Sequence, residues 1–118
     1  MNKVAIVVLA DKETHSDMGR IANALEAAKE LKEGGDEVSI IFDGAGTRWV
    51  GPLADKDNQM NPLFEAVRHK VDGACYFCSG AFGVKNEVEK TGIPFLQDYD
   101  GHPSLKAYLD KGYQIITF

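Results

Sequence analysis

Val4-Ala5-Ile6-Val7-Val8-Leu9 is an unbroken apolar run near the start of the chain. β-branched residues dominate it and no polar residue alternates with them, which is the pattern of a parallel strand covered on both faces. The run is too short to cross a bilayer, and no small-residue cleavage signal follows it. We therefore expect it to be a central strand of a parallel sheet.

A helical pattern follows this strand after a polar segment, 10–15. Apolar residues recur at three- and four-residue steps from Met18 to Leu31, which predicts a helix. Ser16 or Asp17 is expected to cap its start, and Gly34-Gly35 is expected to end it.

Strand-like and helical patterns go on alternating to the end of the chain. They predict strands over 37–42, 74–77, 93–96 and 113–118, a short helical turn over 47–50, a loop over 52–61, and helices after Pro62, over 84–90 and from Pro103. This order predicts a single α/β domain, 1–118, that is three-layered and doubly wound, with a five-stranded, mostly parallel sheet.

Composition and charge exclude some functions. The chain has 118 residues, a formal net charge of −5 and 13 Lys and Arg that are spread along it, so we expect no nucleic-acid partner. We expect no membrane partner either, because no apolar run is long enough. Two closely spaced cysteines and no targeting segment favour a cytoplasmic protein over a secreted disulfide framework.

Both cysteines lie in one stretch, 73–83, which reads as a buried strand that runs into a glycine-rich turn before a helix. Ser79 is the expected N-cap and Gly80 the flexible residue of the turn. This places Cys78 at the mouth of the strand, where the helix N-terminus would stabilise a thiolate, and Cys75 nearer the strand. The alternative is that both are small buried hydrophobic residues, but Cys-x-x-Cys spacing also lets two sulfurs exchange a bond or share a metal.

Polar side chains follow the other predicted strands, at the edge where the ligand crevice of a parallel sheet lies. They are His15 after the first strand, Asp43 and Gly44 after the second, and Asp98, Asp100 and His102 after the fourth. His102 is our first choice as the base that takes a thiol proton. Turn formation alone could also explain residues 98–102.

Two other kinds of site stay open. The two cysteines with His15 and His102 make up the ligand inventory of a tetrahedral zinc site, although we assign no metal. The turn Asp43-Gly44-Ala45-Gly46 lacks the third glycine of a dinucleotide fingerprint and the lysine of a P-loop, so nucleotide binding is disfavoured. A non-catalytic module that uses this turn and the acidic edge to bind a small ligand or a partner protein is the alternative function.

One set of features extends along almost the whole chain. It consists of the strand 4–9, Gly19-Arg20 in the first helix, the segment 38–44 with its Phe-Asp-Gly ending, Cys75-Tyr76-Phe77-Cys78 followed by Gly83-Val84, and Gly112-Tyr113 before the last strand. Together these features resemble the DsrE/DsrF-like proteins of sulfur metabolism.

This resemblance implies a flavodoxin-like fold and a sulfur carrier or sulfurtransferase subunit that passes a persulfide between donor and acceptor proteins. It implies no cofactor beyond the sulfur, and assembly as a trimer or hexamer. By position Cys75 matches the carrier cysteine, with Cys78 as a resolving or accessory thiol. Phe82 stands where many relatives have an arginine, which removes a cation that could stabilise a thiolate.

Self-association is also expected from the composition. Apolar residues make up 44% of the chain, and Trp49, Met60 and Phe118 are candidates for exposed positions. Homo-oligomers with closed symmetry are the usual assemblies in which soluble proteins bury such residues. The alternative is that Trp49 folds back on its own domain.

Overall fold

The computed structural model describes all residues, Met1–Phe118. The strands are β1 (Lys3–Val8), β2 (Glu37–Phe42), β3 (Val71–Cys75), β4 (Phe95–Leu96) and β5 (Gln114–Thr117). The helices are α1 (His15–Glu33), α2 (Val50–Ala54), α3 (Asn61–Val67), α4 (Tyr76–Ala81), α5 (Lys85–Thr91) and α6 (Leu105–Asp110), with 3-10 turns η1 (Gly44–Trp49) and η2 (Arg68–Lys70). None of these helices is both long enough and apolar enough to span a membrane.

The five strands form one open sheet in the order β4-β3-β2-β1-β5, and every pairing is parallel. The prediction of an α/β domain with a five-stranded parallel sheet is therefore confirmed. The apolar run at the start of the chain supplies β1, which pairs with both β2 and β5 as a strand covered on two faces should. The strand order differs from the 2-1-3-4-5 order of flavodoxin itself.

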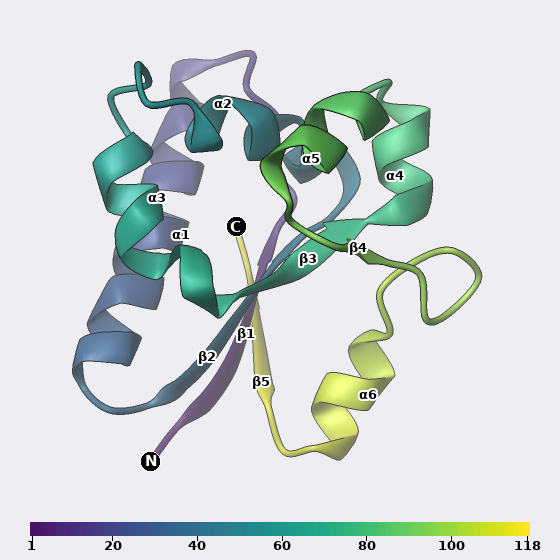
Figure 1. Cartoon of the computed structure of the whole chain (residues 1–118). Coiled ribbons are helices and arrows are strands. Elements are labelled where there is room, and N and C mark those ends of the chain that lie inside the picture. Colours follow the sequence, from purple (N-terminus) through teal and green to yellow (C-terminus); the bar gives the residue numbers. More distant parts are fainter.

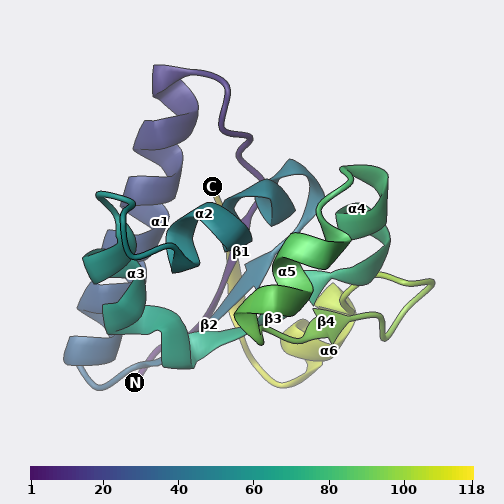
Figure 2. The ribbon, with the colours of Figure 1, turned by 45° about the horizontal axis from the view of Figure 1, so that its top comes forward.

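The handedness of the crossovers decides which face each helix covers. From β1 to β4 the chain steps in one direction across the sheet, so right-handed crossovers place α1, α2, α3 and α5 on one face. The return from β4 to β5 runs the other way and places α6 on the opposite face (Figures 1 and 2). We call these the thick face and the thin face.

The two faces bury very different cores. On the thick face 19 buried residues form one cluster, and Phe42 and Phe64 meet edge to face inside it at a ring-centroid distance of 6.3 Å. On the thin face only Ala5, Val7 and Ile41 form the buried cluster, with partly buried side chains such as Tyr108 packed on them. Most of the hydrophobic stabilisation therefore comes from the thick face.

The N-cap of the first helix lies two or three residues before the expected caps. Thr14 is the N-cap, and its side chain accepts a hydrogen bond from the backbone N–H of Asp17. The Asp17 carboxylate in turn accepts the N–H of Thr14, which completes a capping box. Ser16 and Asp17 are thus inside the helix, because this reciprocal pair satisfies more free N–H groups than either residue could alone.

The third strand also differs from the prediction of 74–77. β3 ends at Cys75, and Tyr76 and Phe77 already belong to α4, so Ser79 is not the N-cap. Gly73 lies inside the strand, at a point where β3 and the chain leading into β4 are very close. A Cβ at this position would lie 2.5 Å from the carbonyl oxygen of Pro94, so only glycine fits. Close contact between β3 and the chain leading into β4 thus outweighs the weak strand propensity of glycine.

Of the three apolar residues that suggested self-association, Trp49 is buried within the chain and the other two are partly buried. Trp49 is only 5% exposed, and its indole Nε1 donates to the carbonyl oxygen of Asp11 at 2.9 Å. Met60 and Phe118 pack against the thick-face core. The alternative that Trp49 folds back on its own domain is therefore confirmed.

The expected loop over 52–61 is shorter than predicted, because α2 includes its first residues.

The apolar side chains of the last helix, α6, are only partly covered. Tyr108 packs on the thin-face core, but Leu105 and Leu109 are 37% and 57% exposed. α6 is thus a short helix that is held mainly through one side chain.

Candidate functional site

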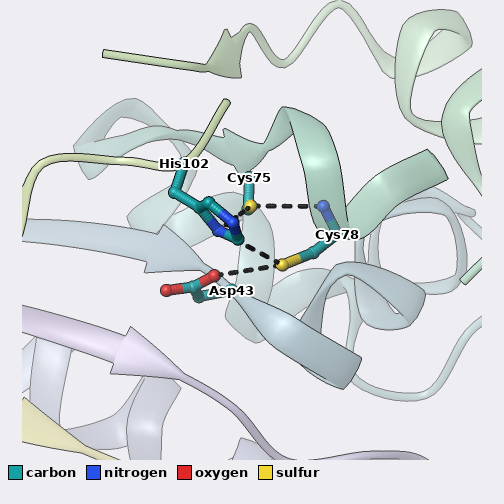
Figure 3. A group of neighbouring side chains, drawn as sticks. All are labelled: Asp43, Cys75, Cys78 and His102. Carbon is teal, nitrogen blue, oxygen red and sulfur yellow. Dashed lines mark hydrogen bonds between the residues drawn. The ribbon is translucent and has the colours of Figure 1, made fainter. Parts of the chain in front are cut away.

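Four side chains converge at the carboxyl ends of β2 and β3. The ligand atoms of Asp43, Cys75, Cys78 and His102 all lie within 4.8 Å of one another (Figure 3). Asp43 follows β2, Cys75 ends β3, Cys78 lies in the first turn of α4, and His102 lies in the connection from β4 to α6. We call this group the thiol cluster.

The β3–α4 junction fixes both cysteines. Cys75 is the N-cap of α4, and its Sγ accepts the backbone N–H of Cys78 at 3.3 Å. The Ser79 hydroxyl is buried beneath and donates to the Cys75 carbonyl oxygen at 2.7 Å. The one tight turn of helix after the strand therefore places Cys78 beside Cys75, with both thiols free.

A tight turn carries His102 to the cysteines. Tyr99 and His102 exchange both backbone hydrogen bonds, and Asp100 and Gly101 between them have φ values of +50° and +80°. Two positive φ values are the signature of a type I′ turn, which a following glycine permits. The Phe77 N–H donates to the Gly101 carbonyl oxygen at 2.9 Å, so the turn is attached to α4.

The imidazole ring of His102 lies against the ring of Phe77, with a centroid distance of 5.0 Å. Its Nδ1 lies 3.3 Å from Cys75 Sγ and 3.9 Å from Cys78 Sγ. Phe77 therefore orients the ring so that one nitrogen faces both sulfurs. Sequence reasoning missed this role of Phe77, although its position one residue before Cys78 was a signal.

The two thiols have different environments. Cys75 is fully buried, and this burial is the largest cause that raises its pKa to about 12. The Cys78 thiol and the charge of Asp43 raise the pKa further, and the Cys78 backbone N–H opposes them. Cys78 is 8% exposed, and its thiol donates to Asp43 Oδ1 at 3.4 Å. Cys75 is thus a protonated thiol at neutral pH, and Cys78 is the more accessible sulfur.

The other predicted site residues lie around the thiol cluster or apart from it. The N–H of Gly44 donates to Asp43 Oδ1 at 2.9 Å and so orients that carboxylate. His15, Gly80, Asp98 and Asp100 are exposed and are not members of the cluster. The fourth ligand-type side chain beside the cysteines and His102 is therefore Asp43, whereas the zinc alternative from the sequence had named His15.

The glycine-rich turn after β2 has a packing explanation. A Cβ at Gly46 would lie 2.0 Å from the carbonyl oxygen of Val8, so the backbone of η1 passes directly over β1. No ligand is needed to explain that glycine. A surface depression of about 760 Å³ elsewhere is lined by residues such as Arg68, Glu87 and Lys90 and contains no thiol or imidazole.

Comparisons with known proteins place the chain as follows. No family model matches it. A chain in the structure of a conserved protein of unknown function, BT1422 from Bacteroides thetaiotaomicron, has a TM-score of 0.63 at 20% identity, over 97% of this chain and 94% of that one, which supports the fold alone. Uncharacterized protein MJ0733 of Methanocaldococcus jannaschii is 36% identical over 115 residues, which is 97% of this chain and 93% of that protein. The chain therefore belongs to the same family as Uncharacterized protein MJ0733.

Proposed function

We propose that this protein is a DsrE-like sulfur carrier, a subunit of a sulfur-transfer system that holds a persulfide on its cysteine pair. One observation carries the proposal: two free thiols lie together at the carboxyl end of β3, within 3.3 Å and 3.9 Å of one imidazole nitrogen. A thiolate is the nucleophile in sulfur exchange, and an adjacent base supplies it from a thiol.

Sulfur is accepted by Cys78 in this proposal, because Cys78 is the less deeply buried of the two thiols, 8% exposed against 0% for Cys75. His102 takes the Cys78 proton, and the resulting thiolate attacks the outer sulfur of a donor persulfide. The sulfur–sulfur bond of the donor breaks, and the donor leaves as a thiolate that receives the proton. The Cys78 persulfide later gives the same sulfur to an acceptor thiolate, so the complete transfer involves no net oxidation.

Cys75 acts as the second thiol. If it attacked the inner sulfur of a Cys78 persulfide, a Cys75–Cys78 disulfide would form and hydrogen sulfide would leave. Attack requires the thiolate, and burial raises the pKa of Cys75 to about 12. Burial of Cys75 therefore disfavours the thiolate that this attack needs, which protects the persulfide. The family resemblance had placed the carrier role on Cys75, so the two assignments differ in which cysteine accepts the sulfur.

Mass spectrometry after incubation with a low-molecular-weight thiol persulfide tests this function. We expect an adduct of about 32 Da that a reductant removes, the mass of one added sulfur. Both cysteines fall in one tryptic peptide, Val71–Lys85, so substitutions must identify the carrier. Cys78→Ser should abolish the adduct, Cys75→Ser should retain it, and His102→Ala should slow its formation.

His15→Ala is the matched control, since it removes an exposed histidine outside the thiol cluster. An adduct that Cys75→Ser abolishes and Cys78→Ser retains would move the carrier role to Cys75. No adduct in the wild-type protein at neutral pH would reject the sulfur-carrier function.

The proposal extends to partners and location. The donor and the acceptor are proteins, the compartment is the reducing cytoplasm, and the chain assembles as a trimer or hexamer. Exposed apolar side chains at Leu105, Leu109 and Ile116 support assembly through α6 and the edge strand β5. Light scattering coupled to size exclusion tests it, because a mass of 12.9 kDa at micromolar concentration would exclude a stable oligomer.

A further inference from the structure

The thiol cluster brings together two sulfurs, one imidazole nitrogen and one carboxylate oxygen from four separate segments of the chain (Figure 3). Thiolate, imidazole and carboxylate are the three side-chain ligands that proteins use for zinc, and four of them make a closed tetrahedral site. Magnesium and calcium prefer oxygen ligands alone. This combination of sulfur, nitrogen and oxygen ligands therefore favours a borderline-soft divalent ion such as zinc.

The distances also fit such an ion. Zinc bonds of about 2.3 Å to sulfur and about 2.0 to 2.1 Å to nitrogen or oxygen place tetrahedral ligand atoms about 3.3 to 3.8 Å apart. Here Cys75 Sγ and His102 Nδ1 are 3.3 Å apart, Cys78 Sγ and Asp43 Oδ1 are 3.4 Å apart, and Cys78 Sγ and His102 Nδ1 are 3.9 Å apart. No pair of the four ligand atoms exceeds 4.8 Å. Small side-chain rotations would bring all four atoms to bonding distance.

Neighbouring groups hold three of the ligands in place. Asp43 Oδ1 accepts the Gly44 N–H, and Cys75 Sγ accepts the Cys78 N–H. The His102 ring is oriented by Phe77, as described above. Hydrogen bonds to ligating groups are the outer shell that raises metal affinity. The cysteines are buried while Asp43 and His102 are half-buried, so an ion can enter from their side.

We propose that Asp43, Cys75, Cys78 and His102 bind one Zn²⁺ ion per chain. Binding releases the two thiol protons and leaves the neutral imidazole and the carboxylate as the other ligands. This site does not depend on sulfur transfer. Where both occur, the ion and the persulfide compete for the same sulfurs, and the zinc form is unable to accept sulfur.

Titration of chelator-treated, tag-free protein with Zn²⁺ against a chromophoric chelator tests the site. We expect one ion per chain and a dissociation constant of about 50 nM or tighter, the weak end of zinc-finger affinities. Co²⁺ should give the intense visible bands of a tetrahedral ion and a thiolate-to-cobalt charge-transfer band. Zn²⁺ should also protect both thiols of the wild-type protein from alkylation, which needs no variant that could misfold.

Substitutions identify the ligands. Cys75→Ser and Cys78→Ser should each weaken Zn²⁺ binding by about 100-fold or more, and Asp43→Asn by about 10- to 100-fold. His15→Ala and Asp98→Asn are the matched controls, because they remove an exposed histidine and an exposed aspartate outside the cluster. Both should bind as the wild type does.

A dissociation constant weaker than about 1 μM for the wild-type protein, an octahedral Co²⁺ spectrum, or unchanged affinity in Cys78→Ser would each overturn the site. The sulfur-loading assay on metal-free protein is read separately. Tight zinc binding without a sulfur adduct would support the metal site and reject the carrier function. A sulfur adduct without zinc binding would support the carrier function and reject the metal site.

Discussion

The two faces of the sheet differ in what covers them and in what they carry. The thick face is covered by α1, α2, α3 and α5 over a cluster of 19 buried residues. The thin face has α6 alone over a cluster of three. A protein with one face so much better packed should draw its stability from that face and leave the other free for polar and reactive side chains.

The thiol cluster continues the rows of side chains on the thin face. Asp43 lies two residues beyond Ile41, and Cys75 two residues beyond Gly73, which is the partner of Ile41 in the register. Side chains alternate along a strand, so both point to the side of α6. His102 comes from the β4–α6 connection, the one crossover on that side. The reactive side chains therefore lie on the side of the sheet that has the smaller hydrophobic core.

The largest expected effect comes from opening a cavity on the thick face. Phe64→Ala removes a fully buried ring that packs edge to face on Phe42, and it should lower the free energy of unfolding by about 3 to 5 kcal/mol. Urea unfolding followed by circular dichroism measures it. Leu109→Ala, on the exposed side of α6, is the comparison and should cost about 0.5 kcal/mol or less. Equal losses in the two variants would show that the faces contribute alike.

The next effect tests the contact that joins β3 to β4. Gly73→Ala would place a Cβ 2.5 Å from the Pro94 carbonyl oxygen and 2.8 Å from Leu96 Cγ, so β4 must move. We expect a loss of about 1 to 3 kcal/mol in stability. Because His102 follows β4 in the chain, we also expect faster alkylation of Cys75.

Gly19→Ala is the matched control for this substitution. It adds the same methyl group in α1, where no atom lies within 4 Å, and should stabilise the protein by about 0.5 to 1 kcal/mol through helix propensity. If Gly73→Ala behaved like Gly19→Ala, the close contact between β3 and β4 would not matter for the fold.

A smaller effect tests how α6 is held on the thin face. The Tyr108 hydroxyl donates to the Asp72 carboxylate, and burial followed by this hydrogen bond raises the pKa of Tyr108. Tyr108→Phe should lower stability by about 1 kcal/mol at pH 7, since the pair is half-buried.

The wild-type protein and Tyr108→Phe should also differ in how their stability changes with pH. Above the ordinary tyrosine pKa of 10.0 the unfolded chain loses the hydroxyl proton while the folded chain keeps it. The unfolded state then binds fewer protons, so stability falls as the pH rises further. Tyr108→Phe lacks this group, and its stability should fall less than that of the wild type between pH 7 and about pH 10.5. Parallel curves for the two proteins would contradict the assignment.

The smallest effect compares the caps of one helix from each face. Thr14 caps α1 and Ser104 caps α6, and each accepts one backbone N–H. Either substitution by alanine should cost about 0.5 to 1 kcal/mol in local helix stability. Hydrogen exchange should show the change across the whole protein for Thr14→Ala but within α6 alone for Ser104→Ala. Global loss of protection in Ser104→Ala would mean that α6 unfolds only with the thick face.

The α/β fold and most of its elements follow from patterns that can be read in the sequence alone. The unbroken apolar run at 4–9 requires a strand covered on both faces, and the helical spacing from Met18 to Leu31 requires a long amphipathic helix. The second strand was predicted with its observed bounds, Glu37–Phe42. These features depend on interactions between residues close in the chain, and so a local pattern is enough to specify them.

Sequence reasoning also placed Asp43, both cysteines and His102 at one edge of the sheet, because side chains that follow parallel strands gather there. It named His102 as the first choice of base, but it grouped His15 with His102 as a possible zinc ligand, since only the order of the strands shows which histidine lies beside the cysteines. β2, β3 and β4 are adjacent in the sheet, so the residues that follow them meet. The residues after β1 enter α1 on the thick face instead.

The end of the third strand and the deeper burial of Cys75 depend on contacts between segments that are distant in the chain. Tyr76 and Phe77 have strong strand propensity, yet they lie in α4, where Tyr76 packs on Phe95 and Phe77 on His102. Both partners are distant in sequence, and their contacts outweigh a local preference worth less than about 1 kcal/mol. The shift makes Cys75 the buried cap and Cys78 the accessible sulfur, a distinction that follows from packing between segments and not from their spacing.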